Sequence, residues 1–396
     1  MNHPGAAHPD PHDTADSGPD LVAYVGVIAI MTGPLPAPDE LRAALHERLG
    51  RPVDIRPVEL ARPGDDEALF AFVTQAVRPR PTPGPAWQCW AVTGLSDDRW
   101  AVLLAARHDI ADAGVVTAVL AGLGADDAGQ TTVGAARRNA VSAGGGTRFS
   151  AVQVSLADAA SACQAFDVTL NELALTAITN GVRTALRHRG RDPRRLSVRA
   201  RQPLSARAAA AAARMGRRVP VLPRGLPVEE PDVLRQLQTV HRAMAGLKAD
   251  ARHRNLLLPA AASMPLVLAR RAIKLLATPP RDDVLVTMTN VTGPRDHRDM
   301  LGRPIVCLVG VAPVPPIGQA AVMLLSYGQD LTFGLTADCD TFPLADDATH
   351  GIARTIEHLA AAARHPHPGR PALALIGPRA TGDQRLGERN TDDRAG

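Results

Sequence analysis

The stretch RWAVLLAARHDIADAGVVTAVLAGL, residues 99 to 123, decides the fold and holds the main candidate for chemistry. Its first part, Trp100 to Ala106, is a continuous apolar run that predicts a buried strand. Four polar side chains follow this run: Arg107, His108, Asp109 and Asp112. Small residues then lead into a second apolar segment, which predicts a helix up to Leu123.

Two interpretations of this polar cluster stay open on spacing alone. A histidine where a core strand passes into a loop is held rigidly and can still face a cleft, which suits a catalytic base. The alternative is that the histidine and the aspartate only cap a strand end and a helix start. The rest of the chain has to decide between them.

The composition indicates a globular protein with a large core. At 396 residues, of which 45% are hydrophobic, the chain is long enough for two or three domains or for one fold with two similar halves. The net charge of +4 comes from interspersed acidic and basic residues. Its arginine clusters lack interleaved aromatic residues, so nucleic-acid binding is not expected. A mildly basic surface suits an anionic small ligand or anionic lipid headgroups.

Cysteine usage and the chain ends point to a cytoplasmic protein. The four cysteines form no CxxC pair and have no zinc spacing, so they are expected to be reduced and no metal site is predicted. Residues 1–20 lack the basic and apolar regions of a secretory signal and are expected to be a disordered tail. No run of about 18 uninterrupted apolar residues predicts a membrane span.

Strand and helix patterns alternate before residue 123. Apolar β-branched runs predict strands at 21–31, 87–92 and 100–106, and a proline-containing alternating segment predicts a short edge strand at 51–63. Apolar positions at helical spacing predict helices at 39–49 and 65–77. Residues 124–147 carry no periodic pattern and are expected to be a linker.

The same alternation continues after the linker. Thr169 and Glu172 have the spacing of a capping box at the start of the longest helix, which Gly190 ends. Asp232 is expected to cap the next helix, 233–248. The remaining elements are an alanine-rich helix or loop at 206–213, strands at 148–155, 196–204, 284–291, 304–312, 321–327 and 331–338, and helices at 156–166 and 345–363. We therefore predict an α/β fold with mixed sheets and flanking helices.

The segment 255–278 is strongly apolar, contains Pro259 and Pro265, and carries a basic second part. A helix pair packed on the core is the plainer interpretation. The alternative is a helix that lies on a lipid surface.

Several motifs occur in order over residues 21 to 364. They are PAWQCWAVTGL (85–95), RHDIADA (107–113), RFSAVQVSL with the following helices (148–190), PLSAR (203–207), GRRV (216–219), LPVEEPD (226–232), TNVTGP (289–294) and LLSYGQDLTFGLTAD (324–338). Together they resemble the bacterial wax ester synthase/acyl-CoA:diacylglycerol acyltransferase family, which belongs to the superfamily of chloramphenicol acetyltransferase and condensation domains. RHDIADA is similar to the HHxxxDG motif of this superfamily, with Arg107 for the first His and Ala113 for the Gly.

The resemblance implies two chloramphenicol acetyltransferase-like halves, 21–123 and 148–364, with an active-site tunnel between them and a flexible tail at 365–396. It implies that His108 is the base, and that Arg107 and Asp112 mainly hold the loop. Asn171 and Glu172 stand where the family has an Asn-Asp pair, with helix capping as the alternative to a site role. The tunnel candidates are Thr289, Asn290, Ser326 and Tyr327, for which plain sheet packing is the alternative.

The implied function is transfer of a fatty acyl group from acyl-CoA, a co-substrate rather than a bound cofactor, to an alcohol or a diacylglycerol hydroxyl. Because Arg107 and Ala113 depart from the HHxxxDG motif, two alternative functions stay open. One is a relative that binds acyl-CoA, an acyl carrier or a partner protein without turnover, and the other is a tailoring acyltransferase of natural products. A cytoplasmic protein with peripheral association to a membrane or lipid-droplet surface through 255–278 is compatible with the first function.

Overall fold

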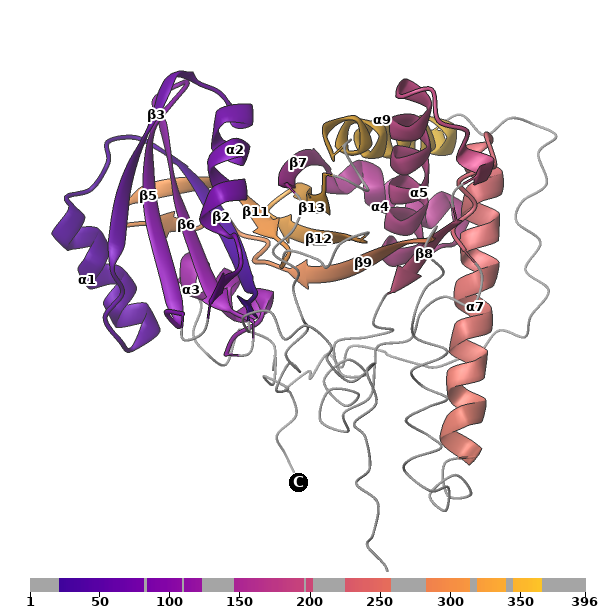
Figure 1. Cartoon of the computed structure of the whole chain (residues 1–396), viewed down its shortest axis with the longest axis horizontal. Coiled ribbons are helices and arrows are strands. Elements are labelled where there is room, and N and C mark those ends of the chain that lie inside the picture. Colours follow the sequence, from indigo (N-terminus) through magenta and orange to yellow (C-terminus); the bar gives the residue numbers. More distant parts are fainter. Residues whose placement is uncertain are drawn as a thin grey trace, which may run out of the picture.

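The computed structural model describes most of the chain and shows two α/β lobes side by side (Figure 1). The described residues are 21–81, 84–108, 110–122, 146–195, 197–201, 225–257, 283–313, 319–339 and 345–364. The segments predicted as the N-terminal tail, most of the linker, the 206–213 helix or loop, most of 255–278 and the C-terminal tail lie outside these residues.

The first lobe is built on a six-stranded mixed sheet. Its strands, in spatial order, are β10 (Asp299–Met300), β11 (Arg303–Val311), β2 (Tyr24–Thr32), β6 (Arg99–Arg107), β5 (Trp87–Leu95) and β3 (Ile55–Gly64). β3 lies at the edge and pairs in parallel with β5, while the other pairs are antiparallel. This confirms the predicted edge strand. A two-stranded ribbon, β1 (Leu21–Val22) and β4 (Arg80–Pro81), lies beside this sheet.

Three helices cover the two faces of this sheet. α2 (Asp66–Ala76) packs on one face through Leu69 and Val73, which contact the core that includes Trp90. α1 (Pro38–Leu49) and α3 (Ala113–Ala121) cover the other face. α3 begins five residues after His108, so the sheet and this helix together fix the path of the turn that carries the histidine.

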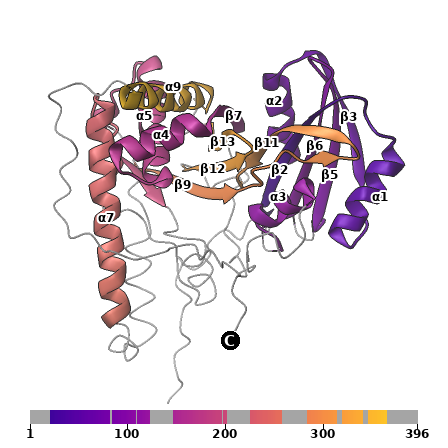
Figure 2. The same cartoon turned by 180° about the vertical axis from the view of Figure 1, so that it is seen from behind.

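The second lobe has five strands in the order β7 (Thr147–Ser155), β13 (Asp330–Asp338), β12 (Gln319–Tyr327), β9 (Asp283–Thr292) and β8 (Ser197–Arg201). β9 is parallel to both β12 and β8, so this sheet is also mixed. One face carries α4 (Leu156–Phe166), α5 (Leu170–His188), α7 (Val233–Leu257) and α9 (Ala345–Arg364), and a short turn of helix, η1 (Pro193–Arg195), follows α5. α7 stands at the outer edge of this lobe in both views (Figures 1 and 2).

Local capping residues fix where several of the helices begin. Asp65, Asp112, Ser155 and Thr169 each accept a hydrogen bond from a backbone amide in the first turn of the next helix. The Thr169–Glu172 capping box is confirmed. Asp232 Oδ1 accepts hydrogen bonds from the amides of Leu234 and Arg235, as predicted, but α7 runs to Leu257 rather than ending at Lys248.

The two lobes are joined because two strands from the second half of the chain belong to the sheet of the first lobe. β10 and β11 follow β9 of the second lobe in sequence, yet β11 pairs with β2 of the first. Thr332 Oγ1 and Thr336 Oγ1 of β13 donate hydrogen bonds, 2.9 and 3.0 Å long, to the Leu308 and Ala312 carbonyls. The two sheets therefore share a core, a feature that hydrophobic periodicity does not show.

Candidate functional site

His108 lies in the turn directly after β6. Its amide donates to the Ala23 carbonyl at 3.0 Å, and the Arg107 amide before it donates to the Ala86 carbonyl at 2.9 Å. The Arg107 carbonyl accepts the amide of Ile110 at 2.9 Å, which closes the turn. The His108 side chain is exposed. A rigid backbone thus presents an accessible imidazole, which is the arrangement that a general base needs.

Asp112 caps α3. Its Oδ1 accepts the Val115 amide at 3.0 Å, and a second backbone bond comes from Gly114. Burial raises the pKa of this carboxyl, while the two amide contacts act in the opposite direction. Arg107 Nη1 donates to the Gly84 carbonyl at 3.5 Å. Through these contacts both residues support the turn that carries His108.

α3 connects this turn to the second lobe. Ala111 and Val116 belong to the same buried cluster as Val291 at the end of β9 and Leu325 of β12. Beyond β9, the Gly293 amide donates to the Ser326 carbonyl at 2.9 Å. The carboxyl ends of β9 and β12 therefore lie on the side of the second sheet that meets α3.

Two of the predicted site residues from distant parts of the chain meet here. Asn290 Nδ2, near the end of β9, donates to Asn171 Oδ1, in the first turn of α5, at 3.0 Å. Asn290 and its neighbour Thr289 are exposed, and Asn171 is half-buried. This pair holds the N-terminus of α5 over the end of β9.

Glu172 points into the protein instead. It is 1% exposed, and its Oε2 accepts both the Thr169 amide at 3.0 Å and a hydrogen bond with His241 Nδ1 at 3.1 Å. Helix capping, one of the two roles considered for Glu172, accounts for the first contact. No sequence motif marks His241. Its only signal in the sequence is a helical spacing that places it on the apolar face of α7 with Leu237 and Met244.

Ser326 and Tyr327 end β12. Tyr327 is buried, and its hydroxyl accepts the Arg298 amide at 2.7 Å and donates to the Ile305 carbonyl at 3.0 Å. His297 packs edge-to-face against its ring, with 5.5 Å between the centroids. Burial raises the pKa of Tyr327. Through these contacts Tyr327 connects β11 to the loop that follows β9. Ser326 beside it is half-buried.

Three of the four cysteines lie in surroundings that suppress thiolate formation. Burial raises the pKa of Cys89 and Cys307 to about 12 and that of Cys163 to about 11. Such thiols are poor nucleophiles at neutral pH. Within the described ranges, no group of three or more His, Cys, Asp or Glu side chains is placed to hold a metal ion.

Two family models match this chain and together cover more than half of it. Residues 53–143, which include His108 and Asp112, match the wax ester synthase/diacylglycerol acyltransferase catalytic domain. Residues 215–360, which include the ends of β9 and β12, match the C-terminal domain of the same family.

Curated relatives and solved structures agree with these matches. A Mycobacterium tuberculosis protein named as a diacylglycerol O-acyltransferase, tgs1, is 28% identical over 85% of this chain and 91% of its own length. A second protein of that organism with the same type of name, Rv3371, is 29% identical over 85% and 86%. The wax ester synthase/diacylglycerol acyltransferase of Marinobacter aquaeolei VT8 aligns with a TM-score of 0.61 at 19% identity, over 87% of this chain and 96% of that one.

A condensation domain of the calcium-dependent antibiotic synthetase aligns with a TM-score of 0.50 at 16% identity, over 89% of this chain and 93% of that one. The fold is thus the two-lobed architecture of the chloramphenicol acetyltransferase-like enzymes. The chain belongs to the wax ester synthase/diacylglycerol acyltransferase family and is an O-acyltransferase of that type. This confirms the resemblance, and acyl-CoA is the co-substrate that the family uses.

Proposed function

We propose that this protein transfers a fatty acyl group from acyl-CoA to the hydroxyl of a diacylglycerol or a long-chain alcohol, with His108 as the general base. The observation that carries the proposal is the exposed imidazole on a backbone fixed by the Ala23 contact, inside the segment that matches the catalytic domain. The names of the relatives support diacylglycerol as the acceptor.

The proposed reaction needs one group that takes and returns a proton. His108 accepts the proton of the acceptor hydroxyl as the oxygen attacks the thioester carbonyl carbon, and a tetrahedral oxyanion forms. The carbon–sulfur bond then breaks, and the imidazolium gives its proton to the departing coenzyme A thiolate. Arg107 is the preceding residue, and a positive charge close to the ring favours the neutral imidazole. No acyl-enzyme is required, in keeping with the raised thiol pKa values of Cys89 and Cys307.

Other candidates have supporting roles in this proposal. Asp112 sets the start of α3 and thereby the turn that carries His108. Asn171, Asn290 and Thr289 form the polar end of β9 and α5, where they would line the acceptor side of the tunnel. Ser326 and Tyr327 shape this end of the sheet, Tyr327 through its hydroxyl contacts.

The test uses purified full-length protein, palmitoyl-CoA, and either hexadecanol or dipalmitoylglycerol, with release of the coenzyme A thiol followed by a chromogenic disulfide. His108→Ala is expected to lower the rate about 10²–10⁴-fold, which is the usual contribution of a general base. His350→Ala is the matched control, because His350 is another exposed histidine, on α9. It should retain the wild-type rate.

Equal rates for wild type and His108→Ala would overturn the role of His108. Acyl-CoA binding without product from any acceptor would instead favour a member of the family that binds without turnover. Comparison of the two acceptors distinguishes the wax ester and diacylglycerol reactions.

We also infer peripheral association with a lipid surface, because both proposed acceptors, a diacylglycerol and a long-chain alcohol, are largely apolar. No helix among the described residues is long and apolar enough to cross a membrane. The basic second part of 255–278, which contains Arg270 and Arg271, is the proposed contact. Co-flotation with lipid droplets is expected for wild type and should weaken in the Arg270→Gln/Arg271→Gln variant, whereas unchanged flotation of that variant would contradict this contact.

A further inference from the structure

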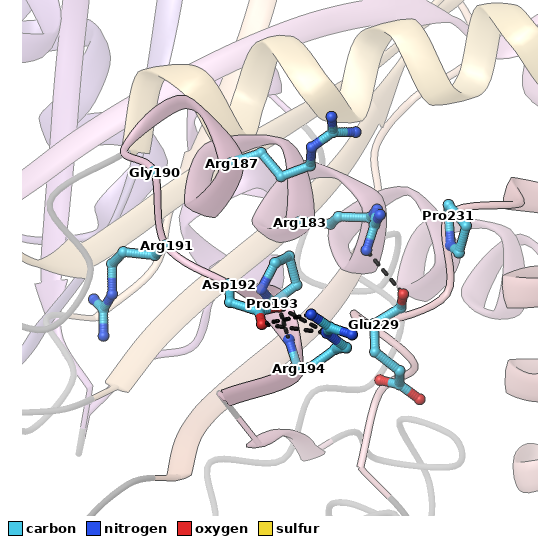
Figure 3. A pocket seen from close by; sticks show the side chains of 9 residues that line it. All are labelled: Arg183, Arg187, Gly190, Arg191, Asp192, Pro193, Arg194, Glu229 and Pro231. Carbon is cyan, nitrogen blue, oxygen red and sulfur yellow. Dashed lines mark hydrogen bonds and ion pairs between the residues drawn. The ribbon is translucent and has the colours of Figure 1, made fainter.

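The C-terminal end of α5 and the segment after it are strongly basic. Residues 183 to 201, RTALRHRGRDPRRLSVRAR, contain eight arginines and a single carboxylate, Asp192. Four of these arginines, with Glu229 and Pro231 of the segment before α7, surround a cavity on the outer side of the second lobe (Figure 3). This cavity involves neither the turn of His108 nor the Asn171–Asn290 pair.

The cavity has a volume of about 500 Å³. Its lining residues are Arg183, Arg187, Gly190, Arg191, Asp192, Pro193, Arg194, Glu229 and Pro231. Gly190 adopts a φ of 66°, which lets the chain turn sharply from α5 into η1. That turn brings arginines from the helix and from the following segment to one opening.

One of the four arginines is neutralised within the cavity. Arg194 forms a forked contact with Asp192, through Nε at 3.1 Å and Nη2 at 3.0 Å. This contact lowers the pKa of the Asp192 carboxyl, so the carboxylate remains ionised at neutral pH. Asp192 also accepts the Arg194 backbone amide at 3.0 Å, which fixes the geometry of the turn.

The other three arginines keep their positive charge available. Arg183 Nη1 donates to the carbonyls of Val228 and Glu229 at 2.8 and 2.9 Å, which hold the guanidinium in place without neutralising it. The side chains of Arg187 and Arg191 are exposed and make no hydrogen bond or ion pair within the described part of the chain, whereas their backbone groups take part in the turn after α5. In Figure 3 the Arg187 side chain lies above Arg183, and the Arg191 side chain lies to the left, apart from the other arginines.

The charges of the cavity match a small dianion. Four arginines and two carboxylates, Asp192 and Glu229, leave an excess of two positive charges. Arginine forks match the oxygen atoms of phosphate and of carboxylate as bidentate donors, and of these two a phosphate monoester carries the second negative charge that the excess calls for. A volume of about 500 Å³ holds a phosphate group with part of the molecule that carries it.

We propose that the cavity framed by Arg183, Arg187, Arg191 and Arg194 is a binding site for a phosphate-bearing ligand, separate from the acyl-transfer site. The phosphate can belong to the headgroup of an anionic phospholipid or to a soluble phosphate ester. Arg183 supplies the anchored cation, and Arg187 and Arg191 supply the two exposed positive charges of the lining.

The first arm of the test measures the soluble ligand. Inorganic pyrophosphate is titrated into the full-length protein by calorimetry at about 0.15 M ionic strength, where non-specific surface attraction is screened. The Arg187→Gln/Arg191→Gln variant is expected to bind at least about tenfold more weakly, because two charged hydrogen-bond donors are lost. Arg51→Gln/Arg78→Gln is the matched control, since both residues are exposed arginines of the first lobe and the change in net charge is the same.

The second arm measures the lipid headgroup by flotation with vesicles of phosphatidylcholine alone and with phosphatidylglycerol added. Saturable pyrophosphate binding without flotation assigns the site to soluble phosphates. Flotation that needs phosphatidylglycerol, and that Arg187→Gln/Arg191→Gln removes, assigns it to headgroups. The proposal is overturned if neither ligand binds, if the cavity variant binds like wild type, or if the control variant loses binding equally.

Discussion

Asp112 shows how one side chain supports the turn that carries His108. Its carboxylate caps α3 through the Val115 amide, yet burial raises its pKa, so ionisation carries a cost in the folded state. Asp112→Ala removes the cap and should lower the free energy of unfolding by about 1 kcal/mol. Asp112→Asn keeps an oxygen acceptor without the cost of ionisation and should be at least as stable as wild type at pH 7, as measured by urea unfolding.

The same residue predicts a pH dependence. Because the folded pKa lies above the unfolded one, the folded state binds the proton more tightly, and the wild type loses stability as pH rises through the interval between the two values. Unfolding midpoints of wild type and Asp112→Asn should therefore diverge in favour of the asparagine variant as pH rises from about 3.9, the unperturbed value. Parallel curves for the two proteins would contradict this assignment.

Cys89 provides a test of the mechanism without an acyl-enzyme. With its pKa raised to about 12 by burial, only on the order of one thiol in ten thousand is ionised at pH 8. Iodoacetamide should leave Cys89 of the native protein unlabelled over an hour, as measured by mass spectrometry of its peptide. Urea-unfolded protein, labelled in parallel, is the control, and rapid labelling of the native thiol would show that it is accessible and activated.

At the scale of elements, the buried Glu172 links the start of α5 to α7. Glu172→Ala leaves the Thr169 amide and His241 Nδ1 without their common acceptor, and should lower the free energy of unfolding by about 2 to 4 kcal/mol. Glu40 is a matched control, because its Oε2 makes the same kind of contact with the Ala37 amide at 3.1 Å on the exposed start of α1. Glu40→Ala should cost less than about 1 kcal/mol.

Urea unfolding of the two variants checks this difference. Equal losses would mean that the His241 contact and the burial of Glu172 contribute nothing beyond the capping box. A third variant, Glu172→Gln, retains an acceptor oxygen for Thr169 and should fall between wild type and Glu172→Ala.

At the scale of the whole molecule, β11 passes close to β13 where the lobes join. A Cβ added at Gly334 would overlap the Gly310 carbonyl oxygen and lie 3.2 Å from the Phe149 ring. Backbone cannot yield as a flexible side chain can, so Gly334→Ala should cost about 3 kcal/mol or force the lobes apart. Thermal unfolding and small-angle scattering measure the two effects.

Gly246→Ala is the control for this substitution. Gly246 is exposed within α7 and has open space around a Cβ position, so alanine should raise stability by about 0.5 to 1 kcal/mol through helix propensity. A Gly334→Ala protein as stable as wild type would contradict the close crossing.

Much of the fold follows from local patterns. The capping residues Thr169 and Asp232 predict two helix starts correctly, and the alternating segment before Asp65 predicts the edge strand β3. The site is only partly predictable. His108 is marked by its place after a core strand, whereas the His241–Glu172 contact has no signature, because its partners are 69 residues apart and belong to different helices.

The sequence alone indicates most of the strands and helices, where the capped helices begin, and which family the motifs resemble, since these depend on neighbouring residues and on periodicity. Tertiary structure decides that β11 joins the sheet of the other lobe, that Asn171 meets Asn290, and that four arginines share one cavity. These pairings depend on which strand edges and helix ends meet once the core is buried. Every strand presents the same backbone N–H and C=O groups along its edges, so the local sequence of a strand does not determine which strand pairs with it.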